Sequence, residues 1–208
     1  MVTFVGAGSG APDLITVRGA KLLSQADVII YAGSLVNPAL LDYKKEGCAV
    51  YNSAEMTLEE VFAVMKGAEG EGKMTVRLHT GDPCLYGAIK EQMELLDEAG
   101  ISYEVVPGVS SFCGAAAAVK AEYTLPQVSQ TVIITRMEGR TPVPEREKIR
   151  SLAAHQSTMV IFLSTGLLEG LSRELIAGGY APDTPAAFDY KATWPGEKVF
   201  GCTVESLA

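Results

Sequence analysis

The chain of 208 residues is acidic, with a formal net charge of −8 at pH 7, and 48% of its residues are hydrophobic. This charge argues against nucleic acid as the main partner, because phosphate binding requires a basic surface. The apolar runs are far shorter than the roughly 20 residues of a membrane span, and the start lacks the basic segment of a signal peptide. Four scattered cysteines and two histidines argue against a metal site. We therefore expect a cytoplasmic protein that binds no metal, membrane or nucleic acid.

The first half of the chain alternates β-branched runs with helical patterns, which predicts a mostly parallel sheet covered on both faces. Strands are expected at 2–5, 28–31, 48–51, 74–79 and 103–106. Helices are expected at 16–23, after the Asn37-Pro38 cap, from the capping box that begins at Thr57, and at 88–99.

The second half has a denser set of strands, which predicts an α/β domain with a mixed sheet. A small-residue helix at 111–119 and an irregular stretch at 122–130 separate a first domain, 1–115, from a second, 116–208. The second domain is expected to contain strands at 131–135, 158–163, 186–190 and 198–202, with helices at 145–155 and 167–178. Because the sequence stops in what reads as a first helical turn, we expect this domain to be shortened by a helix and a strand.

Three segments punctuated by glycine and proline each follow a predicted strand: 6–19, 80–87 and 106–111. They are expected at the carboxyl ends of strands, where open α/β sheets bind ligands. The first satisfies a loose G-x-G-x-x-A pattern, so a dinucleotide must be considered. Two features oppose it: the second strand ends at Tyr31-Ala32 without an acidic residue for a ribose, and Pro12-Asp13 interrupts the phosphate-binding helix. We favour the interpretation that these glycines let the backbone approach a bulky ligand.

Few polar residues of these segments could bind a ligand or take part in catalysis. Asp82 could accept hydrogen bonds from a ribose or an amino group, or cap the next helix. Ser110 and Ser111 could cap a helix or hold a polar ligand tail. His79 is interpreted as structural. No Ser-His-Asp or Cys-His arrangement is present, so no catalytic residue is assigned.

Together with YAGSLV, LPQVSQT, TRMEGRTPVPE and YKATWP, these segments make the chain resemble the tetrapyrrole methylases over residues 2–208. Among them it is most similar to the precorrin-4 and cobalt-precorrin-4 C(11)-methyltransferases. The resemblance implies the two-domain tetrapyrrole methylase fold, S-adenosylmethionine as donor with S-adenosylhomocysteine as product, and a homodimer. It implies methyl transfer to carbon 11 of a tetrapyrrole in cobalamin and porphyrin biosynthesis.

The resemblance also implies the residues of the two ligand sites. The donor site would be lined by Ser9, Gly81, Asp82, Pro83, Leu85, Tyr86, Ser110, Ser111, Leu163, Tyr190 and Ala192. Gly8 and Gly10 would line the tetrapyrrole trough. Cations that could clamp the substrate's carboxylates are Arg18, Arg77, Lys120, Arg136 and Arg140.

The sequence leaves several alternatives open. Ala32 stands where members acting on uroporphyrinogen carry an aspartate, which disfavours that activity. Methylation of another corrin carbon, of a protein or of RNA, a donor-binding module without turnover, and an NAD-linked oxidoreductase remain alternatives. Neither the presence of cobalt in the substrate nor a catalytic base follows from the sequence.

Overall fold

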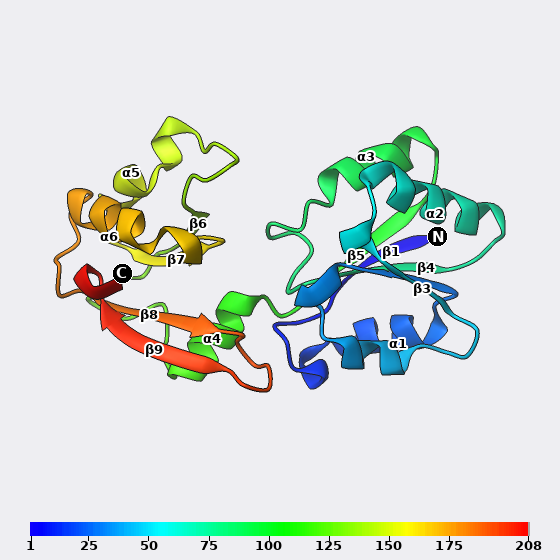
Figure 1. Cartoon of the computed structure of the whole chain (residues 1–208), viewed down its shortest axis with the longest axis horizontal. Helices are drawn as coiled ribbons and strands as arrows, with labels where there is room; N and C mark the ends of the chain where they lie inside the picture. The colour runs from blue at the N-terminus through cyan, green and yellow to red at the C-terminus, as the bar shows by residue number, and fades with distance from the viewer. Residues whose placement is uncertain (208) are drawn as a thin grey trace. The chain divides into compact units, whose positions relative to one another are not determined.

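The computed structural model describes residues 1–207 and divides the chain into two compact units (Figure 1). The first unit contains Met1–Gly114 together with Lys191–Gly196. The second contains Ala115–Tyr190 and the residues from Glu197 onward. The chain therefore returns to the first unit for one short segment, which joins two strands of the second.

The first unit is built on one parallel five-stranded sheet with the order β3-β2-β4-β1-β5. Its strands are β1 (Val2–Gly6), β2 (Val28–Tyr31), β3 (Ala49–Asn52), β4 (Thr75–His79) and β5 (Tyr103–Val106). β1 and β4 are fully buried, as expected of central strands covered on both faces. The expected parallel α/β sheet is confirmed.

Helices cover both faces of this sheet (Figure 1). On one face lie α1 (Val17–Gln25) and the 3₁₀ helix η3 (Pro38–Tyr43); on the other lie α2 (Leu58–Gly70) and α3 (Lys90–Glu98). Leu23 and Leu40 belong to the core of the first face, and Met65 and Leu96 to that of the second. Because side chains alternate along a strand, β1 contributes to both cores.

The predicted caps set where these helices begin. Thr16 Oγ1 accepts a hydrogen bond from Gly19 N at 3.0 Å before α1, and both bonds of the capping box between Thr57 and Glu60 are present before α2. Asn37 caps η3 through Ala39 N. These local predictions are confirmed, although η3 is a 3₁₀ rather than an α-helix.

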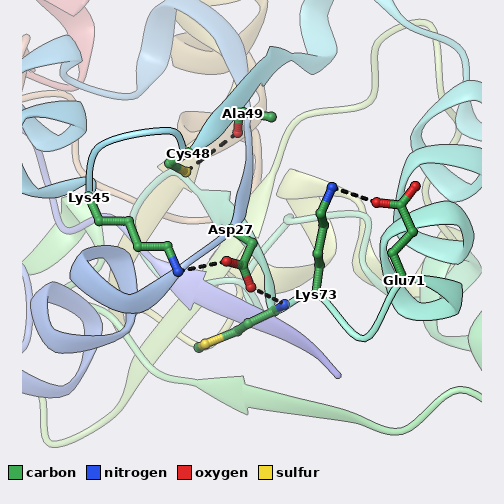
Figure 2. Close-up of polar contacts among 7 residues, drawn as sticks. Asp27, Lys45, Cys48, Ala49, Glu71 and Lys73 are labelled. Atoms are coloured by element: carbon green, nitrogen blue, oxygen red, sulfur yellow. Dashed lines mark hydrogen bonds and ion pairs between the residues drawn. The ribbon is translucent and has the colours of Figure 1, made fainter.

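Polar contacts join residues that lie just before the strands of the sheet begin (Figure 2). Asp27 Oδ1 pairs with Lys45 Nζ at 2.6 Å, and Oδ2 accepts from Met74 N at 2.8 Å. The hydrogen bond from Lys45 is the main cause that lowers the pKa of Asp27. Lys73 pairs beside it with Glu71. Asp27 thereby joins the residues that precede β2, β3 and β4.

The second unit contains two separate two-stranded sheets instead of the single mixed sheet that was expected. β6 (Val132–Arg136) and β7 (Thr158–Phe162) are parallel, and β8 (Pro185–Tyr190) and β9 (Lys198–Thr203) form an antiparallel hairpin. α5 (Ile149–Ala153) and α6 (Leu168–Ala177) pack together in one hydrophobic core. The 3₁₀ turn Glu205–Leu207 follows β9, and its Leu207 joins this core.

Two details of the second unit differ from expectation. The helix expected at 145–155 is split into the 3₁₀ turn Glu145–Glu147 and α5, because Lys148 between them is extended (φ −61°, ψ 146°). β7, whose continuous apolar run is typical of a buried strand, is half-buried. Among the described residues, no helix is long and apolar enough to span a bilayer, and no cluster of three or more acidic, histidine or cysteine side chains could hold a metal ion.

Candidate functional site

The strand order of the parallel sheet changes direction between the neighbouring strands β1 and β4. From β1 the chain runs through α1 to β2 on one side of the pair, and from β4 it runs through α3 to β5 on the other side. The two connections also cover opposite faces of the sheet (Figure 1). Open α/β sheets bind ligands at such a switch point, at the carboxyl ends of the strands. The segments after β1 and β4 carry the first two glycine motifs.

Backbone contacts join the three glycine-rich segments. Gly8 and Gly81 form an isolated antiparallel bridge, in which Gly81 N donates to Gly8 O at 3.0 Å. A Cβ on Gly108 would lie 2.7 Å from Gly6 Cα and would overlap the Gly81 carbonyl. A Cβ on Gly6 would lie 2.6 Å from the same carbonyl oxygen. The absence of side chains at these positions is what lets the three segments meet.

Asp82 fastens the second segment to the third. Its Oδ1 accepts a hydrogen bond from Cys84 N at 2.8 Å, and its Oδ2 accepts one from Gly108 N at 2.9 Å. The first bond closes a local turn rather than capping the next helix, because α3 begins at Lys90 with Ile89 as its N-cap residue. The second bond reaches the segment after β5. Because a carboxylate has about four acceptor positions, both oxygens can still accept from a ligand.

Hydroxyl groups without partners lie beside Asp82. Ser110 and Ser111 precede and begin α4 (Ser111–Val119), and within the described part of the chain their side chains make no hydrogen bond. A Cβ on Gly81 would be 3.5 Å from Ser110 Cα, so the second and third segments touch here. Tyr86, in the second segment, is 44% exposed and has a positive φ of 56°. This edge therefore presents hydroxyls, a carboxylate and an exposed aromatic ring.

Side chains from elsewhere in the sequence hold the first segment. Asn37 Nδ2 donates to Gly10 O at 2.9 Å, and Thr193 Oγ1 accepts from Ala11 N at 2.9 Å. Thr193 Oγ1 also lies 3.2 Å from Ser9 Oγ. A Cβ on Gly10 would overlap the indole of Trp194. None of these three outside side chains was predicted as part of the site; the only signal in the sequence was the YKATWP motif that contains two of them.

Comparison with known proteins assigns the family. Residues 1–208 match the family of Tetrapyrrole (Corrin/Porphyrin) Methylases. The chain is a tetrapyrrole methylase. It is 56% identical over 207 residues to the cobalt-precorrin-4 C(11)-methyltransferase of Methanocaldococcus jannaschii, a match that covers 100% of this chain and 80% of the relative.

Solved structures agree with this assignment. The methylase matches the X-ray structure of the cobalt precorrin-4 methyltransferase CbiF with a TM-score of 0.97 and 53% identity, over 99% of this chain and 86% of CbiF. It matches the uroporphyrin-III C-methyltransferase of Thermus thermophilus, solved in complex with S-adenosylhomocysteine, with a TM-score of 0.81 and 27% identity, over 99% and 84% of the two chains. The expected tetrapyrrole methylase fold is thus confirmed.

The residues expected to line the methylase's donor site are distributed over both units. Those of the three segments lie together at the switch point: Ser9, Gly81, Asp82, Pro83, Leu85, Tyr86, Ser110 and Ser111. Ala192 also belongs to the first unit and is buried. Leu163 and Tyr190 belong to the second unit. Leu163 is 73% exposed with a positive φ of 54°, so its side chain is available to a ligand.

The cations expected to clamp a substrate fall into different environments. Arg18 on α1, Lys120 and Arg140 are exposed. Arg136 is half-buried, and its guanidinium donates to the carbonyl oxygens of Thr141 and Pro142, both at 2.9 Å. Arg136 therefore shapes the loop that carries Arg140.

The prediction that Arg77 clamps a substrate carboxylate is wrong. Its side chain is 6% exposed and donates to Gln92 Oε1 at 3.0 Å and to Ile30 O at 3.2 Å. Burial lowers its pKa to about 10. Arg77 is a structural side chain beneath the α3 face of the sheet.

His79, two residues further along β4, is also buried. It is 3% exposed, and its Nε2 has no hydrogen-bond partner among the described residues. Burial, and secondarily the nearby Arg77, lower its pKa to about 3. A ring that stays neutral and faces the core cannot exchange protons with a ligand at neutral pH, which agrees with the structural interpretation.

This buried ring predicts a pH dependence of stability. Between pH 6.5 and 3 the unfolded chain binds a proton that the native state excludes, so stability falls as the pH falls through this window. Wild type is expected to lose about 1–2 kcal/mol more than His79→Leu when the pH drops from 6.5 to 5. Urea unfolding at the two pH values measures this. The exposed His155 provides the control His155→Gln, which should keep the wild-type dependence; equal losses in wild type and His79→Leu would contradict the prediction.

Proposed function

We propose that this chain transfers a methyl group from S-adenosylmethionine to carbon 11 of precorrin-4 or its cobalt form, in cobalamin biosynthesis. The whole-chain similarity to cobalt-precorrin-4 methyltransferases carries this proposal. Ala32, which directly follows β2, is consistent with it, because uroporphyrinogen-methylating members are expected to carry an aspartate there.

The switch point fits the donor in its chemistry. S-adenosylmethionine supplies an electrophilic methyl group on a sulfonium, and it carries a ribose diol, an amino group and a carboxylate. Asp82 offers acceptor positions for the diol or the amino group, and the hydroxyls of Ser110 and Ser111 can donate to the carboxylate. Gly6 and Gly108 let the three segments pack together at this end of the sheet, which brings Asp82 close to Ser110 and Ser111. No pyrophosphate cradle is needed, because this donor has no phosphate.

The protein's contribution to the reaction would be alignment and exclusion of water. Carbon 11 of the acceptor is electron-rich, so transfer needs an in-line arrangement more than a strong base. No residue of the site offers an activated nucleophile: burial and the neighbouring Asp82 raise the pKa of the Cys84 thiol. Gly8 and Gly10 would line the tetrapyrrole trough, and the acceptor's carboxylates would contact Arg18, Arg136 and Arg140.

Arg140→Ala is expected to raise the KM for the tetrapyrrole about fivefold, because an exposed ion pair contributes about 1 kcal/mol or less. The affinity for S-adenosylhomocysteine should not change. Steady-state kinetics and calorimetry measure the two quantities. Arg146→Ala, at another exposed arginine of the same region, is the control; a normal KM in Arg140→Ala would exclude a clamp.

The proposal is tested by turnover with labelled S-adenosylmethionine and precorrin-4 or cobalt-precorrin-4, followed by NMR assignment of the methylated carbon. Methyl on another carbon would establish a related activity on the same fold. Binding of S-adenosylhomocysteine without product would establish a donor-binding module. Calorimetric binding of NAD but not of S-adenosylhomocysteine would overturn the proposal.

The assembly and location of the protein are also proposals. The family resemblance supports a cytoplasmic homodimer. Sedimentation equilibrium should give twice the 22.0 kDa chain mass, and a monomer at micromolar concentration would contradict the dimer.

A further inference from the structure

The segment Lys191–Gly196, here called the return loop, joins β8 to β9 but packs in the first unit. Its Thr193 Oγ1 accepts from Ala11 N at 2.9 Å and lies 3.2 Å from Ser9 Oγ. Its Trp194 indole occupies the space where a Cβ of Gly10 would be. Three successive residues of the glycine segment thus lie against three residues of the return loop, Ala192, Thr193 and Trp194.

The return loop has an unusual backbone. Lys191 and Thr193 have positive φ values of 58° and 65°. For a β-branched residue such as Thr193 this conformation is a genuine outlier, and it persists only where surrounding contacts impose it. Strained residues of this kind concentrate at ligand clamps. The two hydrogen-bond contacts of Thr193 are among those that hold it.

The glycine segment depends on these contacts for its shape. Asn37 fixes Gly10 from the β2 side, and the return loop fixes Ser9, Gly10 and Ala11 from the other. By contrast, the second and third segments are joined to each other through Asp82 and Gly108, without the return loop. Loss of the Thr193 hydroxyl would therefore loosen residues 9–11, whereas the Gly8–Gly81 bridge and the bond from Gly108 N to Asp82 would remain.

We propose that Thr193 and Trp194 are positioning residues for the methyl acceptor, which hold the glycine segment in the shape that the tetrapyrrole lies against. This inference rests on the proposed function, in which Gly8 and Gly10 line the tetrapyrrole trough. Of the expected donor-site residues, Ser9 contacts Thr193 and Ala192 belongs to the return loop, whereas the carboxylate of Asp82 is fixed by Cys84 N and Gly108 N, outside this loop. The inference therefore predicts a larger effect on acceptor binding than on donor binding.

The first test is a kinetic comparison of Thr193→Val, Thr193→Ser and Trp194→Ala. Thr193→Val removes the acceptor for Ala11 N and is expected to raise the tetrapyrrole KM about tenfold, with the Kd for S-adenosylhomocysteine within about twofold of wild type. Trp194→Ala should act in the same direction. Thr193→Ser keeps the hydroxyl and should restore the wild-type KM. Thr131→Val, at an exposed threonine whose side chain makes no hydrogen bond in the described structure, is the matched control.

The second test does not require turnover. Trp194 is the only tryptophan of the chain, so acrylamide quenching of its fluorescence reports directly on the return loop. Quenching should be stronger in Thr193→Val than in wild type or Thr193→Ser. Equal quenching in all three would overturn the packing, and an unchanged KM in Thr193→Val, or a parallel rise of KM and Kd, would overturn the positioning role.

Failure of the proposed function would look different. If wild type binds S-adenosylhomocysteine but forms no product, the KM cannot be measured. The affinity for uroporphyrin III, measured by absorbance titration, is then compared between the variants. Weaker uroporphyrin binding by Thr193→Val than by wild type and Thr193→Ser would support the positioning role even then, and equal binding would overturn it.

Discussion

Gly108→Ala is expected to destabilise the protein by about 3 kcal/mol, the upper part of the usual range for overpacking. Its Cβ would overlap the Gly81 carbonyl and press on Gly6, and both neighbours are backbone atoms that cannot rotate away. Because the three segments meet at this point, we also expect S-adenosylhomocysteine binding to be lost. Urea unfolding followed by circular dichroism, with calorimetry of the folded variant, measures both effects.

Gly67→Ala in α2 is the matched control for this substitution. A Cβ at Gly67 meets nothing within 4 Å, and the residue is helical. Removing a helical glycine should stabilise the protein by about 0.5–1 kcal/mol and leave binding unchanged. If Gly108→Ala unfolds at the wild-type urea concentration and binds normally, the close approach of the segments is not required.

Asp82→Ala is expected to have the second large effect. It leaves Cys84 N and Gly108 N without acceptors, which should cost about 2 kcal/mol of stability, and it removes a ligand contact, which should weaken S-adenosylhomocysteine binding at least about tenfold. Asp82→Asn keeps one oxygen acceptor, so we expect an intermediate stability. Unfolding curves of the two variants measure the contribution of Asp82 to stability, and calorimetry measures its contribution to S-adenosylhomocysteine binding.

Asp42→Ala, at an exposed carboxylate in η3, is the control and should match wild type in both measurements. A lower stability of Asp82→Ala with an unchanged dissociation constant would mean that Asp82 only joins the second and third segments. An unchanged stability with weak binding would mean that the two backbone bonds contribute little.

The sequence predicted what depends on local patterns. Strands β1, β2 and β5 and the caps at Thr16 and Thr57 follow from periodicity and from side-chain-to-backbone bonds between near neighbours. The split of the helix expected at 145–155 was missed because Lys148 is a good helix former that is nonetheless extended. The arrangement of β6 to β9 as two sheets depends on pairing over long distances, which composition does not encode.

The candidate site could be predicted only in part, for the same reason. The three segments were located because glycine, proline and strand ends mark them in the sequence. The bond from Gly108 N to Asp82 and the contact of Thr193 with Ser9 join residues 26 and 184 positions apart. Arg77 could have been interpreted correctly: a lone cation in the middle of a central strand indicates burial with polar partners.

The return loop also affects how the protein is made. The ribosome synthesises Met1–Gly114 first, and the residues that pack against Gly10 follow only after the intervening stretch up to Tyr190. At about 5–20 residues per second, the nascent domain would wait roughly 4–15 s with its glycine turn uncovered. Ligand-competent protein therefore arises only after residue 196 has been synthesised, and a nascent chain released earlier would lack the residues that contact Ser9, Gly10 and Ala11.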